Sequence, residues 1–175
     1  NQTAQHAIEQ LKKTAIFYVF GHGGALFQSC QTFWDGNQWS YMVETEYARQ
    51  RIINSGVPAE RVVALATLPD GALNKVLLAV FEGCYTAYYN DLWGSPAHGA
   101  VAKGADCSLG FTTQIRDPDA HSWAEHFWTR ITGTNDTVQQ AAGYASSFCS
   151  MASGLRDWKI IGASSTGIAP ARYGN

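Results

Sequence analysis

Residues 16–24, with the sequence IFYVFGHGG, decide the fold of this chain. Five consecutive apolar residues, rich in β-branched and aromatic side chains, are typical of a strand that is buried on both faces. This strand ends at a histidine flanked by glycines, His22, where the backbone can turn sharply. Residues 76–84 (VLLAVFEGC) repeat the arrangement, because an apolar strand over 76–81 runs into Cys84. A histidine and a cysteine therefore each follow a predicted strand.

Shorter elements are predicted around these two strands. Thr3 can cap a helix within residues 1–15, and another helix is expected over 46–55 before Gly56 and Pro58. The mixed pattern from residue 33 to 47 indicates a hairpin or a loop. Further short strands are expected over 107–112 and over 158–162.

Two helices are expected between the last two strands. Trp123, Phe127 and Ile131 recur every four residues, which predicts a helix with one face toward the core. Residues 137–140, TVQQ, fit a capping box at the start of the next helix, and residues 164–175 form a polar tail.

Buried strands separated by helices predict an α/β fold in a single domain over residues 1–175. We expect a three-layer sandwich with a mostly parallel central sheet. Ligands bind such sheets beyond the carboxyl ends of the strands. His22 and Cys84 are both predicted to lie at that edge.

Composition excludes several classes of function. With 46% hydrophobic and 15% charged residues, the chain is expected to fold, and its net charge of -2 with scattered Lys and Arg excludes nucleic-acid binding. The longest apolar run is too short for a membrane span, which needs about 20 residues. The glycines after His22 are not followed by the Gly-Lys-Ser/Thr of a phosphate-binding loop, and His121 and His126 are badly spaced for one helix face. We expect no metal and no cofactor.

A histidine beside a cysteine suggests acyl transfer. A thiol attacks as the thiolate, and an imidazole can take its proton or stabilise the ion pair. The developing oxyanion needs backbone N–H donors, which Gly23 and Cys84 can supply. A lone cysteine after a strand is usually a small core residue, but His22 and Cys84 in matching positions favour function.

The two motifs, a strand ending in His-Gly and a strand ending in Glu, a small residue and Cys, resemble those of the caspase–gingipain–clostripain–legumain clan of cysteine peptidases. The stretch GADCSLGFT at 104–112 is similar to the next strand of its bacterial members, so the resemblance covers most of residues 5–163. It implies that His22 and Cys84 are catalytic and that the amide of Gly23 helps to form the oxyanion hole. The substrate would be a peptide or protein, hydrolysed through an acyl-enzyme.

The sequence departs from the clan in two places. Gly83 stands where better-known members have alanine, a change expected to be conservative in size. Only about 15 residues precede the first strand, fewer than the clan fold needs for its usual N-terminal strand. We therefore expect a processed N-terminus, a smaller sheet, or an edge strand covered by another copy or by a separate N-terminal chain.

Candidate substrate-binding residues are Glu82, Asp106 and Arg116. Asp106 with Asp117 and Asp119 would favour a basic side chain, as the resemblance to bacterial members does, whereas Arg116 would favour an acidic one. The sequence leaves this choice open.

Two other functions have some support in the sequence. A lipase-like hydrolase would need Gly-x-Ser-x-Gly, and residues 162–167 have one residue too many between the glycines. A non-catalytic caspase-like scaffold, which self-associates or serves as an assembly module, remains as the alternative.

Cysteines and glycosylation triplets bear on the cellular setting. If Cys84 is the nucleophile, one disulfide is possible among Cys30, Cys107 and Cys149, and we take Cys107 with Cys149 as the pair to test. Triplets for N-glycosylation begin at Asn1 and Asn135, which together with the low charge favours an extracellular location.

Overall fold

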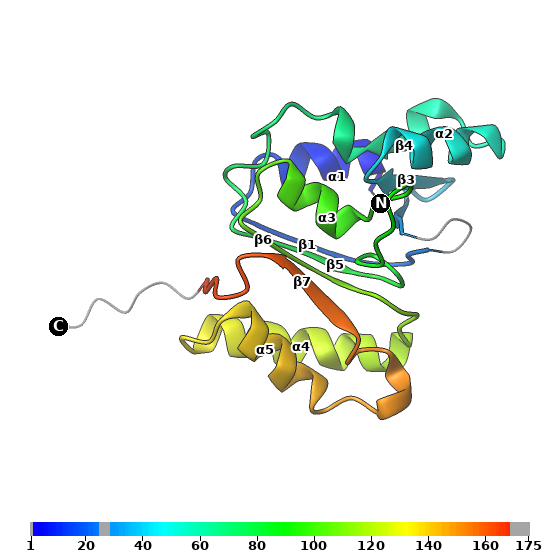
Figure 1. Ribbon diagram of the computed structural model, residues 1–175. Helices are drawn as coiled ribbons and strands as arrows, with labels where there is room; N and C mark the ends of the chain where they lie inside the picture. The colour runs from blue at the N-terminus through cyan, green and yellow to red at the C-terminus, as the bar shows by residue number, and fades with distance from the viewer. Residues whose placement is uncertain (1, 25–28, 169–175) are drawn as a thin grey trace.

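A central four-stranded sheet organises the molecule (Figure 1). The computed structural model describes residues 2–24 and 29–168. The strands lie in the order β1 (Ile16–Phe20), β5 (Leu78–Glu82), β6 (Cys107–Phe111) and β7 (Trp158–Gly162). β1, β5 and β6 are parallel, and β7 runs antiparallel to β6. The predicted α/β class with a mostly parallel sheet is confirmed.

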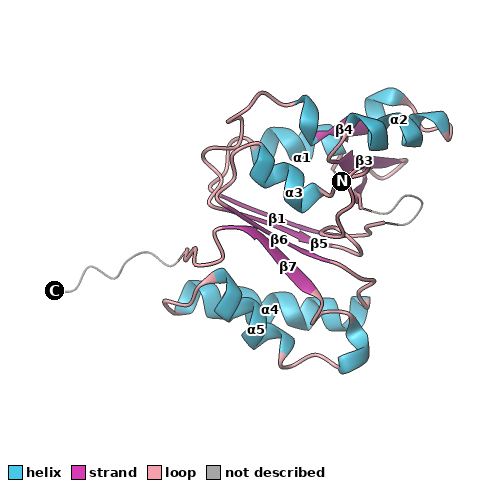
Figure 2. Ribbon diagram, in the orientation of Figure 1, coloured by secondary structure: helices cyan, strands magenta, loops and turns pink. Residues whose placement is uncertain are grey.

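Helices cover both faces of this sheet (Figure 2). α1 (Ala4–Leu11) and α3 (Pro96–Ala102) lie on one face, and α4 (Asp117–Gly133) and α5 (Val138–Ser146) lie on the other. Each interface has its own apolar core, with Phe81 in the first and Trp123 in the second. The layered arrangement follows from β5 and β6, whose residues are buried on both faces.

A second, three-stranded sheet stands beside the first and was not predicted. It consists of β2 (Gln31–Trp34), β3 (Trp39–Val43) and β4 (Val62–Ala64). α2 (Glu46–Asn54) packs against β4 and β3. The hairpin expected in the region from 33 to 47 joins β2 to β3 in antiparallel register. Short 3-10 turns span Ala59–Arg61, Leu65–Thr67 and Met151–Ser153.

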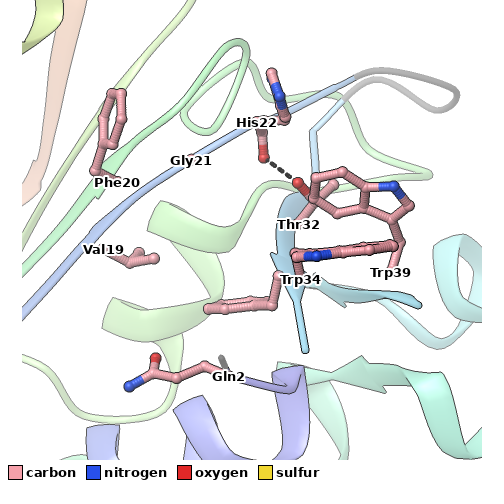
Figure 3. Close-up of a pocket in the computed structure, with 9 residues that line it drawn as sticks. Gln2, Val19, Phe20, Gly21, His22, Thr32, Trp34 and Trp39 are labelled. Carbon is pink, nitrogen blue, oxygen red and sulfur yellow. Dashed lines mark hydrogen bonds between the residues drawn. The ribbon is translucent and has the colours of Figure 1, made fainter. Parts of the chain in front are cut away.

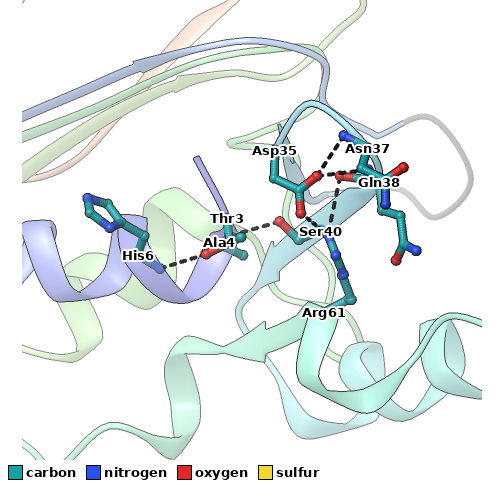
Figure 4. A network of polar contacts seen from close by, with 8 residues as sticks. All are labelled: Thr3, Ala4, His6, Asp35, Asn37, Gln38, Ser40 and Arg61. Atoms are coloured by element: carbon teal, nitrogen blue, oxygen red, sulfur yellow. Dashed lines mark hydrogen bonds and ion pairs between the residues drawn. The ribbon is translucent and has the colours of Figure 1, made fainter. Parts of the chain in front are cut away.

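The Asp35 carboxylate closes the β2–β3 turn (Figure 4). Its Oδ1 accepts hydrogen bonds from the amides of Asn37 and Gln38, at 2.9 and 2.8 Å, and its other oxygen pairs with Arg61. The bonds from Gln38 and Asn37 and the pairing with Arg61 lower the pKa of Asp35 to about 2. The turn is therefore held in one conformation at neutral pH.

The predicted helix caps are present. The Thr3 hydroxyl accepts from the amide of His6 at 3.1 Å, and the neighbouring Ala4 amide donates to the Ser40 hydroxyl at 2.8 Å (Figure 4). The second bond ties α1 to β3. At α5, Thr137 and Gln140 form the predicted capping box.

β1 corrects one prediction, because it is not buried on both faces. It is the outermost strand of the sheet, and Ile16, Tyr18 and Phe20 are 40%, 41% and 49% exposed, whereas Phe17 is buried. The α4–α5 layer covers β5 and β6, and its Trp128 makes an edge contact with Tyr18 of β1. Within residues 2–24 and 29–168, the outer edge of β1 pairs with no other strand.

In the described part of the chain, no helix has the length and apolar character needed to cross a membrane.

Candidate active site

His22 and Cys84 meet at the carboxyl edge of the sheet. Each follows a strand, β1 or β5, and these strands are parallel neighbours, so their ends coincide. Both residues line one pocket of about 290 Å³, together with Gly23, Gly24, Tyr85 and Gln114. The position of the two motifs after adjacent strands thus produces the expected proximity.

The backbone of Gly23 packs directly on the backbone of Cys84. A β-carbon at position 23 would collide with the Cys84 carbonyl oxygen and lie 2.9 Å from its nitrogen and 3.0 Å from the carbonyl oxygen of Cys30. Such distances leave no room for any side chain. Glycine at position 23 is therefore required for the two loops to touch.

The backbone amides of two residues that line this pocket have no hydrogen-bond acceptor in the described part of the chain. Among residues 2–24 and 29–168, the N–H groups of Gly23 and Cys84 donate to no acceptor. The next amide, that of Tyr85, is used internally and donates to the carbonyl of Thr113 at 3.0 Å. Free N–H donors beside a nucleophile are what an oxyanion needs.

The His22 backbone is held firmly while its ring is exposed. Its carbonyl oxygen accepts from the Thr32 amide at 2.9 Å, the Thr32 hydroxyl at 2.7 Å and the Gln31 side-chain amide at 3.3 Å. The imidazole lies at the surface, with its centroid 5.7 Å from the ring of Trp39. This arrangement fixes the backbone that carries the imidazole and leaves the ring accessible to a substrate.

The Cys84 thiol is half-buried and contacts the loop after β6. Its sulfur accepts a hydrogen bond from the Ile115 amide at 3.3 Å, with the Ile115 carbonyl at 3.7 Å. Gln114, which precedes Ile115 in the chain, lines the pocket and was not predicted. The only available signal was its place just beyond the carboxyl end of the third parallel strand.

Gly83 corrects the expectation that alanine would be equivalent there. A β-carbon at this position would lie 2.8 Å from the Gly21 carbonyl oxygen and 3.1 Å from Oε1 of Gln31. The Gln31 side chain is buried and reaches between the two loops, so it cannot easily give way. Glycine at position 83 belongs to this close packing.

Glu82 lies beneath the site instead of lining it. Its side chain is fully buried, and Oε2 accepts a 2.7 Å hydrogen bond from the hydroxyl of Tyr18. Burial raises the pKa of Glu82 to about 7, and burial together with the Glu82 charge raises that of Tyr18. Oε1 has no partner among the described residues. The predicted substrate contact is therefore replaced by a buried carboxyl–phenol pair.

Replacing Glu82 with glutamine should remove a pH dependence of stability. The folded protein holds a proton on Glu82 between the ordinary pKa of 4.5 and about 7, so this group's stabilising contribution falls as pH rises through that window. The loss amounts to about 3 kcal/mol at 1.36 kcal/mol per pKa unit. Urea unfolding of wild type and Glu82→Gln at pH 5 and pH 8 measures the difference. Parallel pH profiles for the two proteins would contradict this account.

The other two predicted substrate-binding residues, Asp106 and Arg116, do not line the pocket of His22 and Cys84. Asp106 precedes β6 and lies at the amino edge of the sheet, roughly 20 Å of strand away from Cys84, so that prediction is wrong. Arg116 is exposed at the start of α4, two residues beyond Gln114, and does not line the pocket. Asp119 faces the end of α5, where Ser150 contacts it at 3.5 Å.

The proposed Cys107–Cys149 disulfide is absent. Both residues carry thiols buried in the α4–α5 core, and the Cys149 sulfur donates to the carbonyl of Ala145 at 3.6 Å. Burial raises the pKa of Cys107 to about 11 and also raises that of Cys149.

Of the two asparagines that begin glycosylation triplets, Asn135 is exposed, whereas Asn1 lies outside the described residues. Within the described ranges, no three His, Cys, Asp or Glu residues cluster closely enough to hold a metal ion.

Comparison with known proteins gives a partial relative. No protein-family model matches the sequence. Over 72 residues the chain is 33% identical to an uncharacterized protein of Archaeoglobus fulgidus, an alignment that covers 38% of this chain and 28% of that protein. The chain thus spans less than a third of the relative's length. The relative's description names no activity.

Proposed function

We propose that this protein is a cysteine peptidase of the caspase-like clan, with Cys84 as nucleophile and His22 as general base. The observation that carries the proposal is the pocket that His22 and Cys84 share, with the unpaired amides of Gly23 and Cys84 beside them. An accessible thiol, an exposed imidazole and two free N–H donors are the parts that acyl transfer needs. The parallel pairing of the His-Gly strand with the Cys strand supports the clan assignment.

The reaction proceeds in two displacements. His22 takes the thiol proton, the Cys84 sulfur bonds to the peptide carbonyl carbon, and the oxyanion is stabilised by the amides of Gly23 and Cys84. The carbon–nitrogen bond then breaks as His22 returns the proton to the departing amine. In the second step, water gives a proton to His22 and its oxygen bonds to the thioester carbon. The carbon–sulfur bond breaks, and the proton returns to the thiolate.

Alkylation by iodoacetamide tests the dyad without a known substrate. Cys84 should react at least about tenfold faster than Cys107 and Cys149, because those thiols are buried and their pKa values are raised. His22→Ala should slow the labelling of Cys84, whereas His126→Ala on α4 should not. Peptide mapping by mass spectrometry gives the rate at each cysteine. Equal rates at all three, or no effect of His22→Ala, would refute the dyad.

A second candidate function is an assembly module, favoured by the exposed edge of β1. Its outer backbone groups pair with no strand in the described chain, and Ile16, Tyr18 and Phe20 are exposed beside them. An uncovered edge strand invites pairing with another chain. In this case Cys84→Ala would sediment as the same oligomer as wild type, and neither protein would cleave a broad peptide library.

A further inference from the structure

A second hollow adjoins the pocket of the dyad and shares His22 with it (Figure 3). Its volume is about 340 Å³, and its lining comes from the end of β1, the N-terminal segment and the β2–β3 hairpin. Two indoles of that hairpin, Trp34 and Trp39, form an aromatic wall, and each is 43% exposed. The chemical steps described above do not use this space.

The aromatic wall stands on a fixed frame. Trp34 and Trp39 are cross-strand partners whose ring centroids lie 5.0 Å apart at 51°. The turn beyond them is closed by Asp35, which pairs with Arg61, and the Gln2 amide donates to the Trp34 carbonyl at 3.2 Å. A ligand ring would therefore meet indoles that are already in place, which keeps the entropic cost of binding low.

The position of the hollow relative to the dyad assigns it to one half of a substrate. In acyl transfer the nucleophile bonds to the carbonyl carbon, and the imidazole delivers its proton to the departing nitrogen. The departing half therefore lies on the imidazole side. The ring of Trp39 lies 5.7 Å from that of His22, and Cys84 does not line this hollow.

Resting on the peptidase activity proposed above, we propose that the Trp34–Trp39 hollow binds the side chain of the residue that follows the scissile bond and selects an aromatic ring there. Aromatic rings gain from tilted and edge contacts with indoles beyond the area they bury. Val19 and Phe20 add apolar surface, and the volume of about 340 Å³ is large enough for an aromatic side chain.

The described residues that line the hollow include no acidic side chain, which favours an aromatic ligand over a cationic one. His22 is the only titratable side chain among the lining residues, all of which lie in the described part of the chain, and none of them is a carboxylate. A Lys or Arg side chain entering the hollow would lose hydration and find no acidic partner. An aromatic side chain loses little hydration and gains ring contacts.

Binding to catalytically inactive Cys84→Ala tests the hollow directly. By ligand-observed NMR, phenylalanyl-glycyl-glycine should bind about tenfold more tightly than alanyl-glycyl-glycine or lysyl-glycyl-glycine. A further Trp39→Ala substitution should remove this preference, and Trp39→Phe should keep most of it. Tyr47→Ala, which removes a ring of similar exposure on α2, should leave it unchanged. Equal binding of the three peptides, stronger binding of the lysyl peptide, or indifference to Trp39→Ala would overturn the proposal.

Cleavage by the wild-type protein separates this proposal from the proposed hydrolysis. In a peptide library varied after the scissile bond, Trp39→Ala should lower kcat/KM for aromatic residues toward that for alanine. Tyr47→Ala, whose ring lies on α2 outside both pockets, should leave kcat/KM unchanged for every residue at this position. If the wild type cleaves nothing, hydrolysis is refuted while the NMR titration still decides what the hollow binds. If it cleaves without regard to this residue, the hydrolysis stands and the aromatic hollow is refuted.

Discussion

Replacing Cys84 with alanine is expected to abolish peptide hydrolysis, with a loss of kcat of at least about 10⁴-fold. Among the described residues that line the pocket, the thiol is the group that can form the acyl intermediate, since His22 acts as the base and the others offer no comparable nucleophile. His22→Ala should cause a loss of similar size, because members of a catalytic unit act together and their effects do not add. Initial rates on a peptide library give both values.

The matched control is Cys149→Ala, which removes a thiol of the α4–α5 core that is 5% exposed. This variant should keep the hydrolytic rate, although it loses some stability. Circular dichroism should show Cys84→Ala folded like the wild type, because Cys84 is only half-buried at the margin of the α4–α5 core and its sulfur hydrogen-bonds with the backbone of Ile115. Hydrolysis that survives Cys84→Ala would exclude Cys84 as the nucleophile.

Replacing Trp123 with alanine is expected to reduce the free energy of unfolding by about 3–5 kcal/mol. This side chain is fully buried at the centre of the α4–α5 core, stacked on Phe127 at 4.9 Å and in edge contact with Phe111 at 5.2 Å. Its indole N–H donates to the Ser146 hydroxyl at 3.1 Å, so the substitution also breaks a bond between α4 and α5. Chemical denaturation measures the loss.

Trp34→Ala serves as the comparison for Trp123→Ala. Trp34 is 43% exposed on the β2–β3 hairpin, so its removal should cost less than about 1 kcal/mol. Similar losses for the two variants would mean that the α4–α5 layer contributes little to the cooperative fold.

The sequence predicted the four strands of the central sheet and the helices α1, α4 and α5 because their signals are local, but it did not predict α3. Apolar runs, the Trp123–Phe127–Ile131 spacing and the capping box at Thr137 depend only on neighbouring residues. It did not reveal that one face of β1 is exposed. An apolar run is the same whether a layer covers one face or two, and only the tertiary arrangement shows that Tyr18 touches the α4–α5 layer through Trp128 and still remains 41% exposed.

In the candidate site, too, some residues could be predicted from the sequence and others could not. His22 and Cys84 could be paired from sequence because parallel strands bring their ends together. Gln114 and Trp39 could not, because each reaches its pocket from a loop or hairpin whose path no pattern specifies. Glu82 was identified beside the cysteine motif, but strand alternation turns its carboxyl under the sheet toward Tyr18.

The backbone contact between Gly23 and Cys84 has a consequence for when the thiol becomes reactive. The two loops belong to strands far apart in the chain, since Tyr18 and Glu82 are 64 residues apart and still hydrogen-bonded. Their contact forms only after β1 has paired with β5, which closes a long loop and belongs to the cooperative folding step. A nascent or partly unfolded copy therefore has no assembled dyad. Peptide hydrolysis by Cys84 should appear together with the native fold and disappear with it on heating.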